Sequence, residues 1–255
     1  MITAKLRSSY VLAAVLVAAL SGCKGAAGPV VPSAAAPNAV GQQSTMMAAP
    51  AEPEAKTFAA VILSPGAVVG TDNLFTPKSG DSKHGGHGQL VDGIPCKPTE
   101  YINQYHIHAY VGLIVNGRQI AIPNAIGMKN PSVAVNGFNE SAKCYYYIHT
   151  HDASGTIHVE VPRNLPPSAS IYNVGNLLDI WGLQKTHTSF GPFTGNIQVF
   201  VGNVPLKQTL VTKYAAVTKS LASIKLRSHE VIWIVIGKKP MLVSKLPSVT
   251  FYTEY

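Results

Sequence analysis

The sequence predicts a mainly β protein of the α+β class, in which antiparallel hairpins are crossed by one short helix. Three observations lead to this prediction: two places where β-rich runs flank a turn sequence, one short run of apolar residues at helical spacing, and one uninterrupted apolar run typical of a buried strand. A weaker repeat of the first hairpin pattern at 196–203 leaves open an arrangement of two similar halves.

The first hairpin is centred on Asn116-Gly117. Residues 107–115 alternate in side-chain character before this pair, and a second β-rich run follows at 118–123. An Asn-Gly pair between two such runs is a strong local signal for a two-residue hairpin turn.

The second hairpin joins residues 145–151 to residues 156–161 through Asp152-Ala153-Ser154-Gly155. If these four residues form the turn, the pairing register places His149 directly opposite His158. A one-residue bulge would turn His158 to the other face and remove this pairing.

Later segments supply the helix and the buried strand. Apolar residues recur at helical spacing over 174–181, and Gly182 can end the helix. The run from Val231 to Ile236 predicts a strand buried on both faces. The stretch 206–226 is ambiguous, because its apolar residues fit a helical stripe while its many Thr and Val residues favour strand or loop.

The N-terminus has the pattern of an export signal. Lys5 and Arg7 precede an apolar run over 10–20, which is too short for a permanent membrane-spanning helix. The tetrad Leu20-Ser21-Gly22-Cys23 resembles the lipobox of bacterial lipoproteins, in which the cysteine becomes the lipidated first residue. We therefore expect a lipid anchor at Cys23; the alternative is an ordinary signal peptide with a chance cysteine.

Localisation and domain organisation follow from the same segment. Lys24 is not an aspartate, so the resemblance implies no inner-membrane retention, and an outer-membrane location on its periplasmic or surface side is favoured. The Ala- and Pro-rich stretch that follows is typical of a flexible tether. The predicted divisions are a lipoprotein signal peptide at 1–22, a tether at 23–57, a His-rich β-hairpin subdomain at 58–163 and a basic β-rich subdomain at 164–255.

Positive charge collects in the C-terminal half. From Arg163 onward ten Lys or Arg residues accompany three acidic residues. These basic residues are spread out and not interleaved with aromatic residues, which favours a solvated surface, and the exported location argues against nucleic acid. Contact with anionic lipid headgroups or polysaccharide is the alternative.

Cys96 and Cys144 are the two cysteines besides Cys23. In an oxidising compartment such a pair most simply forms one disulfide. Strand parity places Cys144 on the same face as Tyr146 and away from His149, so a thiolate ligand in a copper site is not expected.

Histidines provide the most informative pattern. The sequence holds His-x-His twice and His-x-Glu once on predicted strands, and residues i and i+2 of a strand point to the same face. In the expected register these side chains all avoid the apolar faces of the two hairpins. The alternative is a set of exposed polar residues without a ligand. The predicted metal ligands are His106, His108, His149, His151, His158 and Glu160.

Imidazole and carboxylate ligands together suit copper or zinc, and nickel is also compatible. Asp152 could orient a neighbouring histidine, but it is also a natural first residue of an Asx turn, which we favour. His84 and His87 are expected in a solvated loop, and His187 and His229 are expected to be structural, with His229 at the entrance of a strand.

Three motifs stand out along the chain: Tyr105-His106-Ile107-His108, the run from Cys144 through His149-Thr150-His151-Asp152-Ala153-Ser154-Gly155-Thr156-Ile157-His158-Val159-Glu160, and Leu177-Leu178-Asp179-Ile180-Trp181-Gly182. These motifs resemble an uncharacterised family of exported bacterial proteins and lipoproteins. The resemblance covers about Gly93 to Gly237 and implies no activity. The His-x-His pair departs from cupin enzymes, because no glutamate follows it at the cupin interval.

Three functional hypotheses follow. The leading one is a non-enzymatic, envelope-anchored lipoprotein that binds copper or zinc for buffering, sensing or delivery, with the membrane and the metal ion as its partners. The second is a metal-dependent hydrolase or oxygenase with Glu160 as base, which an open pocket and a raised carboxylate pKa would favour. The third is a structural or adhesive envelope module. The sequence has no Gly-x-Ser-x-Gly elbow, phosphate loop or two-cysteine zinc spacing.

Overall fold

The computed structural model describes residues 58–72, 74–75, 85–132, 135–163 and 172–252. The predicted signal peptide, the tether with Cys23, and His84 lie outside the described residues, so those predictions stay as they are. The described residues group into one compact unit.

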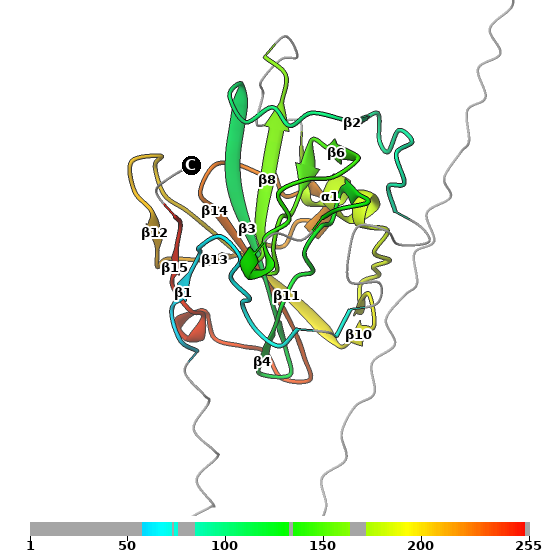
Figure 1. The fold of residues 1–255 in the computed structure, drawn as a ribbon. Coiled ribbons are helices and arrows are strands. Elements are labelled where there is room, and N and C mark those ends of the chain that lie inside the picture. Colours follow the sequence, from blue (N-terminus) through cyan, green and yellow to red (C-terminus); the bar gives the residue numbers. More distant parts are fainter. Residues whose placement is uncertain (1–57, 73, 76–84, 133–134, 164–171, 253–255) are drawn as a thin grey trace, which may run out of the picture. The chain divides into compact units, whose positions relative to one another are not determined.

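One mixed sheet dominates the fold (Figure 1). Its strand order is β13-β11-β14-β3-β8-β7, with β4 paired to β3, and every pairing is antiparallel except that of β14 with β3. The strands are β3 (Tyr105–Val115), β4 (Arg118–Ile120), β7 (Ile148–His149), β8 (Thr156–Val161), β11 (Asn196–Asn203), β13 (Ala215–Ala216) and β14 (Glu230–Gly237).

The predicted fold class, mainly β with one short helix, is confirmed. Helix α1 spans Val174–Trp181, as the spacing predicts, and Gly182 ends it in the left-handed conformation at φ 73°. Its first turn is closed by a reciprocal capping box between Asn173 and Asn176.

Both predicted hairpins form. Asn116 and Gly117 take positive φ values of 48° and 73°, and Val115 pairs with Arg118 across the turn. In the second hairpin His149 pairs with His158, which is the expected register. Only Ile148 and His149 of the strand expected at 145–151 pair with β8, however, because Tyr145 and Tyr146 belong to a separate small sheet. The prediction of a weaker repeat of the first hairpin at 196–203 is wrong. Gly202 and Asn203 form no turn but continue β11 and pair with β14.

The central strand β14 is buried along nearly its whole length, as the apolar run at 231–236 predicts. It lies between β11 and β3, so strands from 58–163 and 164–255 share one sheet. The boundary expected at 163/164 therefore does not separate two sheets.

The remaining elements are short. The ambiguous stretch 206–226 contains β12 (Leu210–Val211), β13 (Ala215–Ala216) and the 3-10 turn η2 (Leu221–Ser223), and so it holds no long helix. The smaller sheets are β1-β15-β12, β2-β6-β5 and β10-β9, and three 3-10 turns accompany them. Their bounds are β1 (Val61–Ile62), β2 (Cys96–Lys97), β5 (Met128–Lys129), β6 (Cys144–Tyr146), β9 (Ser189–Phe190), β10 (Phe193–Thr194), β12 (Leu210–Val211), β15 (Val249–Thr250), η1 (Val135–Gly137), η2 (Leu221–Ser223) and η3 (Val243–Lys245).

Each face of the sheet has its own apolar core. On one face the buried side chains of helix α1 belong to the same apolar core as Ala109, Val111 and Leu113 of β3. The opposite face of β3 carries Tyr110 and Ile114, which pack with β14 and with the small sheet β1-β15-β12. His106 and His108 lie on the same face of β3 as Tyr110 and closer to the start of the strand.

The predicted disulfide joins Cys96 of β2 to Cys144 of β6, with Cα atoms 5.4 Å apart. Within the described part of the chain, no helix has the length and apolar character needed to cross a bilayer.

Candidate metal centre

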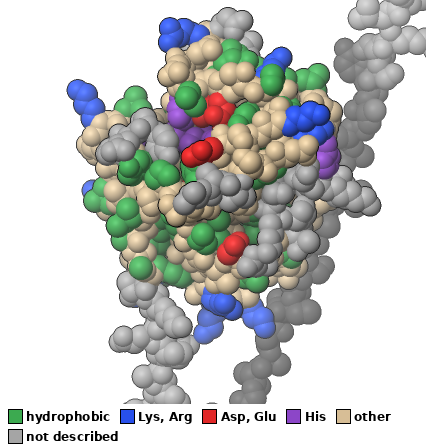
Figure 2. All heavy atoms as spheres, viewed as in Figure 1, with side chains coloured by type: hydrophobic (Ala, Val, Ile, Leu, Met, Phe, Trp, Pro, Cys, Tyr) green, Lys and Arg blue, Asp and Glu red, His purple; other side chains and the backbone are tan. Residues whose placement is uncertain are grey.

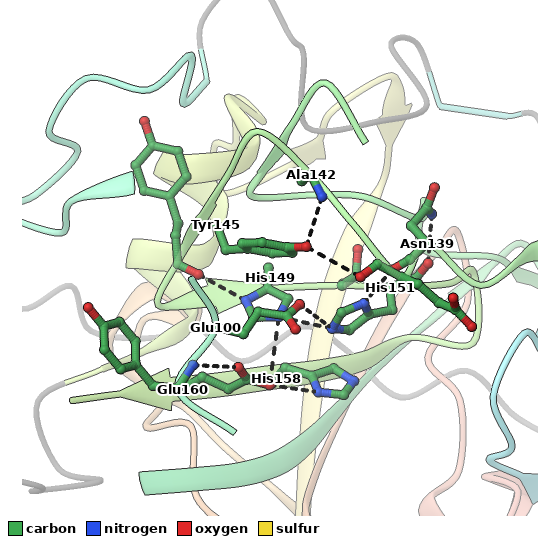
Figure 3. A network of polar contacts seen from close by, with 12 residues as sticks. Glu100, Asn139, Ala142, Tyr145, His149, His151, His158 and Glu160 are labelled. Carbon is green, nitrogen blue, oxygen red and sulfur yellow. Dashed lines mark hydrogen bonds and ion pairs between the residues drawn. The ribbon is translucent and has the colours of Figure 1, made fainter. Parts of the chain in front are cut away.

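Strand pairing gathers the predicted ligands. In the β3–β8 ladder His108 pairs with His158 and His106 pairs with Glu160, and β7 places His149 on the other side of His158. Directly paired side chains on one face have Cβ atoms about 4.5 to 5.5 Å apart. His151 follows β7 by two residues and joins the same group, so all six predicted side chains lie together. Figure 3 shows His149, His151, His158 and Glu160 of this group.

Backbone carbonyl groups fix the orientation of two rings. Nδ1 of His149 lies 2.9 Å from the carbonyl oxygen of Tyr146, and Nδ1 of His151 lies 2.6 Å from that of Asn139. A carbonyl oxygen only accepts, so both Nδ1 atoms carry the hydrogen. In the neutral rings both Nε2 atoms therefore present lone pairs, and these two atoms lie 3.1 Å apart.

The other three histidines form a second group. Nδ1 of His158 lies 3.3 Å from Nε2 of His106 and 3.2 Å from Nε2 of His108. Ligand atoms bound tetrahedrally to one ion, at bonds of about 2.0 to 2.1 Å, are about 3.3 Å apart. Both groups of nitrogens therefore have the spacing of metal ligands.

Glu160 lies between the two groups. Its Oε2 accepts a hydrogen bond from the backbone N–H of Tyr101 at 3.2 Å. Its Oε1 is 3.2 Å from Nε2 of His106, 3.6 Å from Nδ1 of His158 and 3.9 Å from Nε2 of His149. Among the described residues no hydrogen bond reaches this buried oxygen. A buried carboxylate oxygen in this state costs free energy unless a cation or a proton occupies the space beside it.

Glu100 is a site residue that the sequence analysis missed. Its Oε1 lies 3.4 Å from Nε2 of His151 and 3.9 Å from Nε2 of His149 (Figure 3). This oxygen is also buried and accepts no hydrogen bond from the part of the chain that the structure describes. Glu100 belongs to the loop before β3, where strand parity assigns no face. Its signal in the sequence is only its position five residues before the Tyr105-His106 motif.

Burial sets the ionisation of the cluster. Loss of hydration lowers the pKa of His108 to about 3 and lowers that of His149 and His158 well below its usual value, and the neighbouring histidines add to the shift. Loss of hydration also raises the pKa of Glu160 to about 8 and that of Glu100 to about 7. Without a metal the cluster therefore favours neutral side chains, whereas a bound cation would favour the carboxylate forms.

The cluster is open on one side. The stacked rings of Phe138 and His151, 4.6 Å apart, lie beside the opening. In Figure 2 histidine and acidic side chains meet at one place on the surface of the molecule. The pocket has a volume of about 370 Å³ and is lined by Glu100, Ile102, Asn103, His106, Phe138, Glu140, His151, His158 and Glu160.

Two overlapping sets of side chains could hold a metal ion. In each set the ligand atoms lie within 4.8 Å of one another, and His158 belongs to both. Nitrogen and oxygen ligands at this spacing suit zinc or copper. The first set is His149, His151, His158 and Glu160, and the second is His106, His108 and His158.

Asp152 has the turn role that the sequence favours. Its Oδ1 accepts hydrogen bonds from the N–H and the hydroxyl of Ser154, and its Oδ2 accepts the backbone N–H of Gly66 at 2.8 Å. These bonds hold the turn between β7 and β8 and fix the loop at Gly66 to it. Asp152 thus shapes the turn after His151.

The remaining described histidines stand apart from both sets. His87 lies in the loop at 85–90, and His187 is exposed beside β9. His229 directly precedes β14, as expected, and its Nδ1 bonds the carbonyl oxygen of Gln208 at 2.7 Å.

Searches against family models, curated proteins and solved structures found no match for this chain.

Proposed function

We propose that this chain is an exported lipoprotein that binds a transition metal, copper or zinc, through its buried histidine and glutamate cluster. One observation carries the proposal: Nε2 of His149 and Nε2 of His151 face each other at 3.1 Å while both Nδ1 hydrogens are held by backbone carbonyl groups. Two lone pairs this close repel each other, and a cation between them turns repulsion into coordination.

The biological setting rests on the sequence. The lipobox-like tetrad supports an anchor at Cys23, and the motif resemblance supports membership in a family of exported bacterial proteins. With this anchor the protein would work on the periplasmic or surface side of the outer membrane. Buffering, sensing or delivery of the metal fits a site whose pocket opens toward solvent.

The test is binding calorimetry with Zn(II) and Cu(II) near neutral pH. The sample is the full-length chain, stripped with a chelator and carrying no polyhistidine tag. We expect saturable binding. The variant His149→Ala/His151→Ala should bind less metal or bind it at least about tenfold more weakly. His187→Ala removes an exposed histidine outside the cluster and should bind like the unmodified chain.

Absence of binding of either metal would overturn the proposal and leave the structural or adhesive envelope module as the reading of the chain. Equal loss of binding in His187→Ala would show that surface histidines, not the cluster, take up the metal.

A metal-dependent hydrolase or oxygenase is the second candidate. The specific observation in its favour is the open pocket over the cluster, where Glu100 and Glu160 have raised pKa values. Turnover of a chromogenic ester or phosphoester, or metal-dependent oxygen consumption, would support it if chelation abolished the activity and added zinc or copper restored it. A panel without such turnover, measured on protein with its full metal content, would count against it.

A further inference from the structure

The cluster holds more donor groups than one ion can use. Zinc in structural protein sites is almost always four-coordinate, whereas seven side chains bring donor atoms together in this cluster. With one four-coordinate ion, at least three of these donors would be left without a cation. These donors are His106, His108, His149, His151, His158, Glu100 and Glu160.

The donors separate into two groups by strand and by distance. On the β3–β8 side, Nε2 of His106 and Nε2 of His108 lie 3.3 and 3.2 Å from Nδ1 of His158. On the β7 side, Nε2 of His149 lies 3.1 Å from that of His151, which in turn lies 3.4 Å from Oε1 of Glu100. Oε1 of Glu100 lies 3.9 Å from Nε2 of His149, so this carboxylate has to move closer by a few tenths of an ångström to complete the second group. With that shift each group offers three donors at the spacing of one tetrahedral ion.

Glu160 reaches both groups with one oxygen atom. Its Oε1 is 3.2 Å from Nε2 of His106 in the first group and 3.9 Å from Nε2 of His149 in the second. Because Oε2 is engaged by the N–H of Tyr101, Oε1 is the atom available for a shared position. A shared Oε1 would give each group a fourth ligand.

We infer that the cluster is a two-ion centre, in which His106, His108 and His158 hold one metal ion, His149, His151 and Glu100 hold a second, and Oε1 of Glu160 bridges them. This inference rests on the proposed function, since it assigns stoichiometry to the same cluster. Paired ions in protein sites lie about 3.5 to 4 Å apart, a distance that one bridging oxygen can span.

The charge balance agrees with an open site. The positive charge of two divalent ions exceeds the negative charge of Glu100 and Glu160. The excess positive charge lies beside the pocket, where Glu140 and solvent anions can offset it. A closed apolar site would not tolerate this excess charge.

Metal stoichiometry tests the inference. The full-length chain, stripped, untagged and reloaded with Zn(II), is analysed by native mass spectrometry and elemental analysis. We expect two ions per chain for the unmodified protein and for His187→Ala. We expect one ion for His106→Ala/His108→Ala and one for His149→Ala/His151→Ala, because each variant removes two ligands of one ion and leaves the other group intact.

The outcomes separate this inference from the proposed function. One ion per unmodified chain overturns the two-ion centre and leaves metal binding intact, whereas no bound ion overturns both. If His106→Ala/His108→Ala keeps the stoichiometry of the unmodified chain, those histidines are not ligands and the inference fails.

A second measurement needs no variant and so does not depend on the folding of altered chains. Two Cu(II) ions bridged by one oxygen couple magnetically, so the integrated electron paramagnetic resonance signal of the Cu(II)-loaded protein should fall well below the bound copper content. A signal equal to the full copper content would overturn the inference.

Discussion

One face of β3 changes character along its length. At the start of the strand this face presents His106 and His108 to the histidine cluster, and farther along it presents Tyr110 and Ile114 to an apolar core. The backbone alternates in the same way throughout, but the neighbours differ: β8 pairs with the first part and β14 with the second. A single strand face can therefore serve as a binding site at one end and as core at the other, because the residues covering it decide the chemistry.

The largest expected change in stability is at the end of β3 that lies in the apolar core with Tyr110 and Ile114. A Cβ atom at Gly112 would lie 2.3 Å from the ring of Trp233, which is fully buried and has no room to move. We expect Gly112→Ala to lower the free energy of unfolding by about 3 kcal/mol in urea denaturation, with or without metal. Gly237→Ala is the matched control, because its nearest neighbour lies 3.6 Å away, and it should change stability by less than about 0.5 kcal/mol. Equal effects of the two changes would contradict the close packing at Gly112.

At the start of β3, where His106 and His108 lie, bound metal should determine how much a substitution changes stability. Metal at about 100 times its dissociation constant should stabilise the unmodified chain by about 2.7 kcal/mol. In His108→Leu we expect this increment to shrink, while the metal-free variant keeps its stability or gains some, because a buried polar ring is replaced by an apolar one. Thermal melts with and without Zn(II) measure both quantities. An unchanged metal increment in His108→Leu would remove His108 from the ligand set.

Acid should destabilise the metal-free protein through the five histidines of the cluster. The folded-state pKa of each cluster histidine lies below its usual 6.5, so the unfolded chain takes up protons there that the folded chain does not. Stability is then present above pH 6.5 and is lost as the pH falls, by up to about 1.4 kcal/mol per pH unit for each histidine. Glu100 and Glu160, with pKa values raised to about 7 and about 8, act in the opposite direction, but five histidines outnumber them.

Urea denaturation at several pH values between 5 and 7 measures this slope. The slope should be smaller in His108→Leu and unchanged in Gly112→Ala, which alters the core end of the same strand face. A metal-free protein whose stability rises on acidification would contradict the expected sign.

The smallest expected effect concerns the rim of the pocket. The ring of Phe138 stacks on that of His151 at 4.6 Å. Phe138→Ala should weaken metal binding about threefold, through looser positioning of His151, and should leave the stoichiometry unchanged. Calorimetry measures both, and a loss of stoichiometry would show that Phe138 supports the whole centre.

Local patterns in the sequence predict much of this fold. The Asn116-Gly117 turn, helix α1 with its Gly182 end and the buried run of β14 each depend on residues close together in the chain, and all three are confirmed. The strand order is different. The parallel pairing of β14 with β3 joins segments that are far apart in sequence, and nothing in either segment specifies its neighbour. For this reason the sequence predicts two subdomains, whereas the strands of both halves share one sheet.

The same distinction applies to the site. Strand parity brings His149 and His158 together because their register follows from the turn between them. Parity gives no information about Glu100, which reaches the cluster from a loop, or about the carbonyl groups of Tyr146 and Asn139, which every residue type possesses. These backbone acceptors orient the rings, and their role depends on tertiary structure alone.

The disulfide has a consequence for the order in which the protein matures. Cys144 opens β6, and the carbonyl group of Tyr146, two residues later, holds the ring of His149 in place. Cys96 pairs with Tyr146 across β2 and β6, so oxidation of the cysteines ties down the segment that aims this imidazole. We therefore expect thiol oxidation to precede efficient metal uptake, so that the reduced chain should bind the ion more weakly than the oxidised chain.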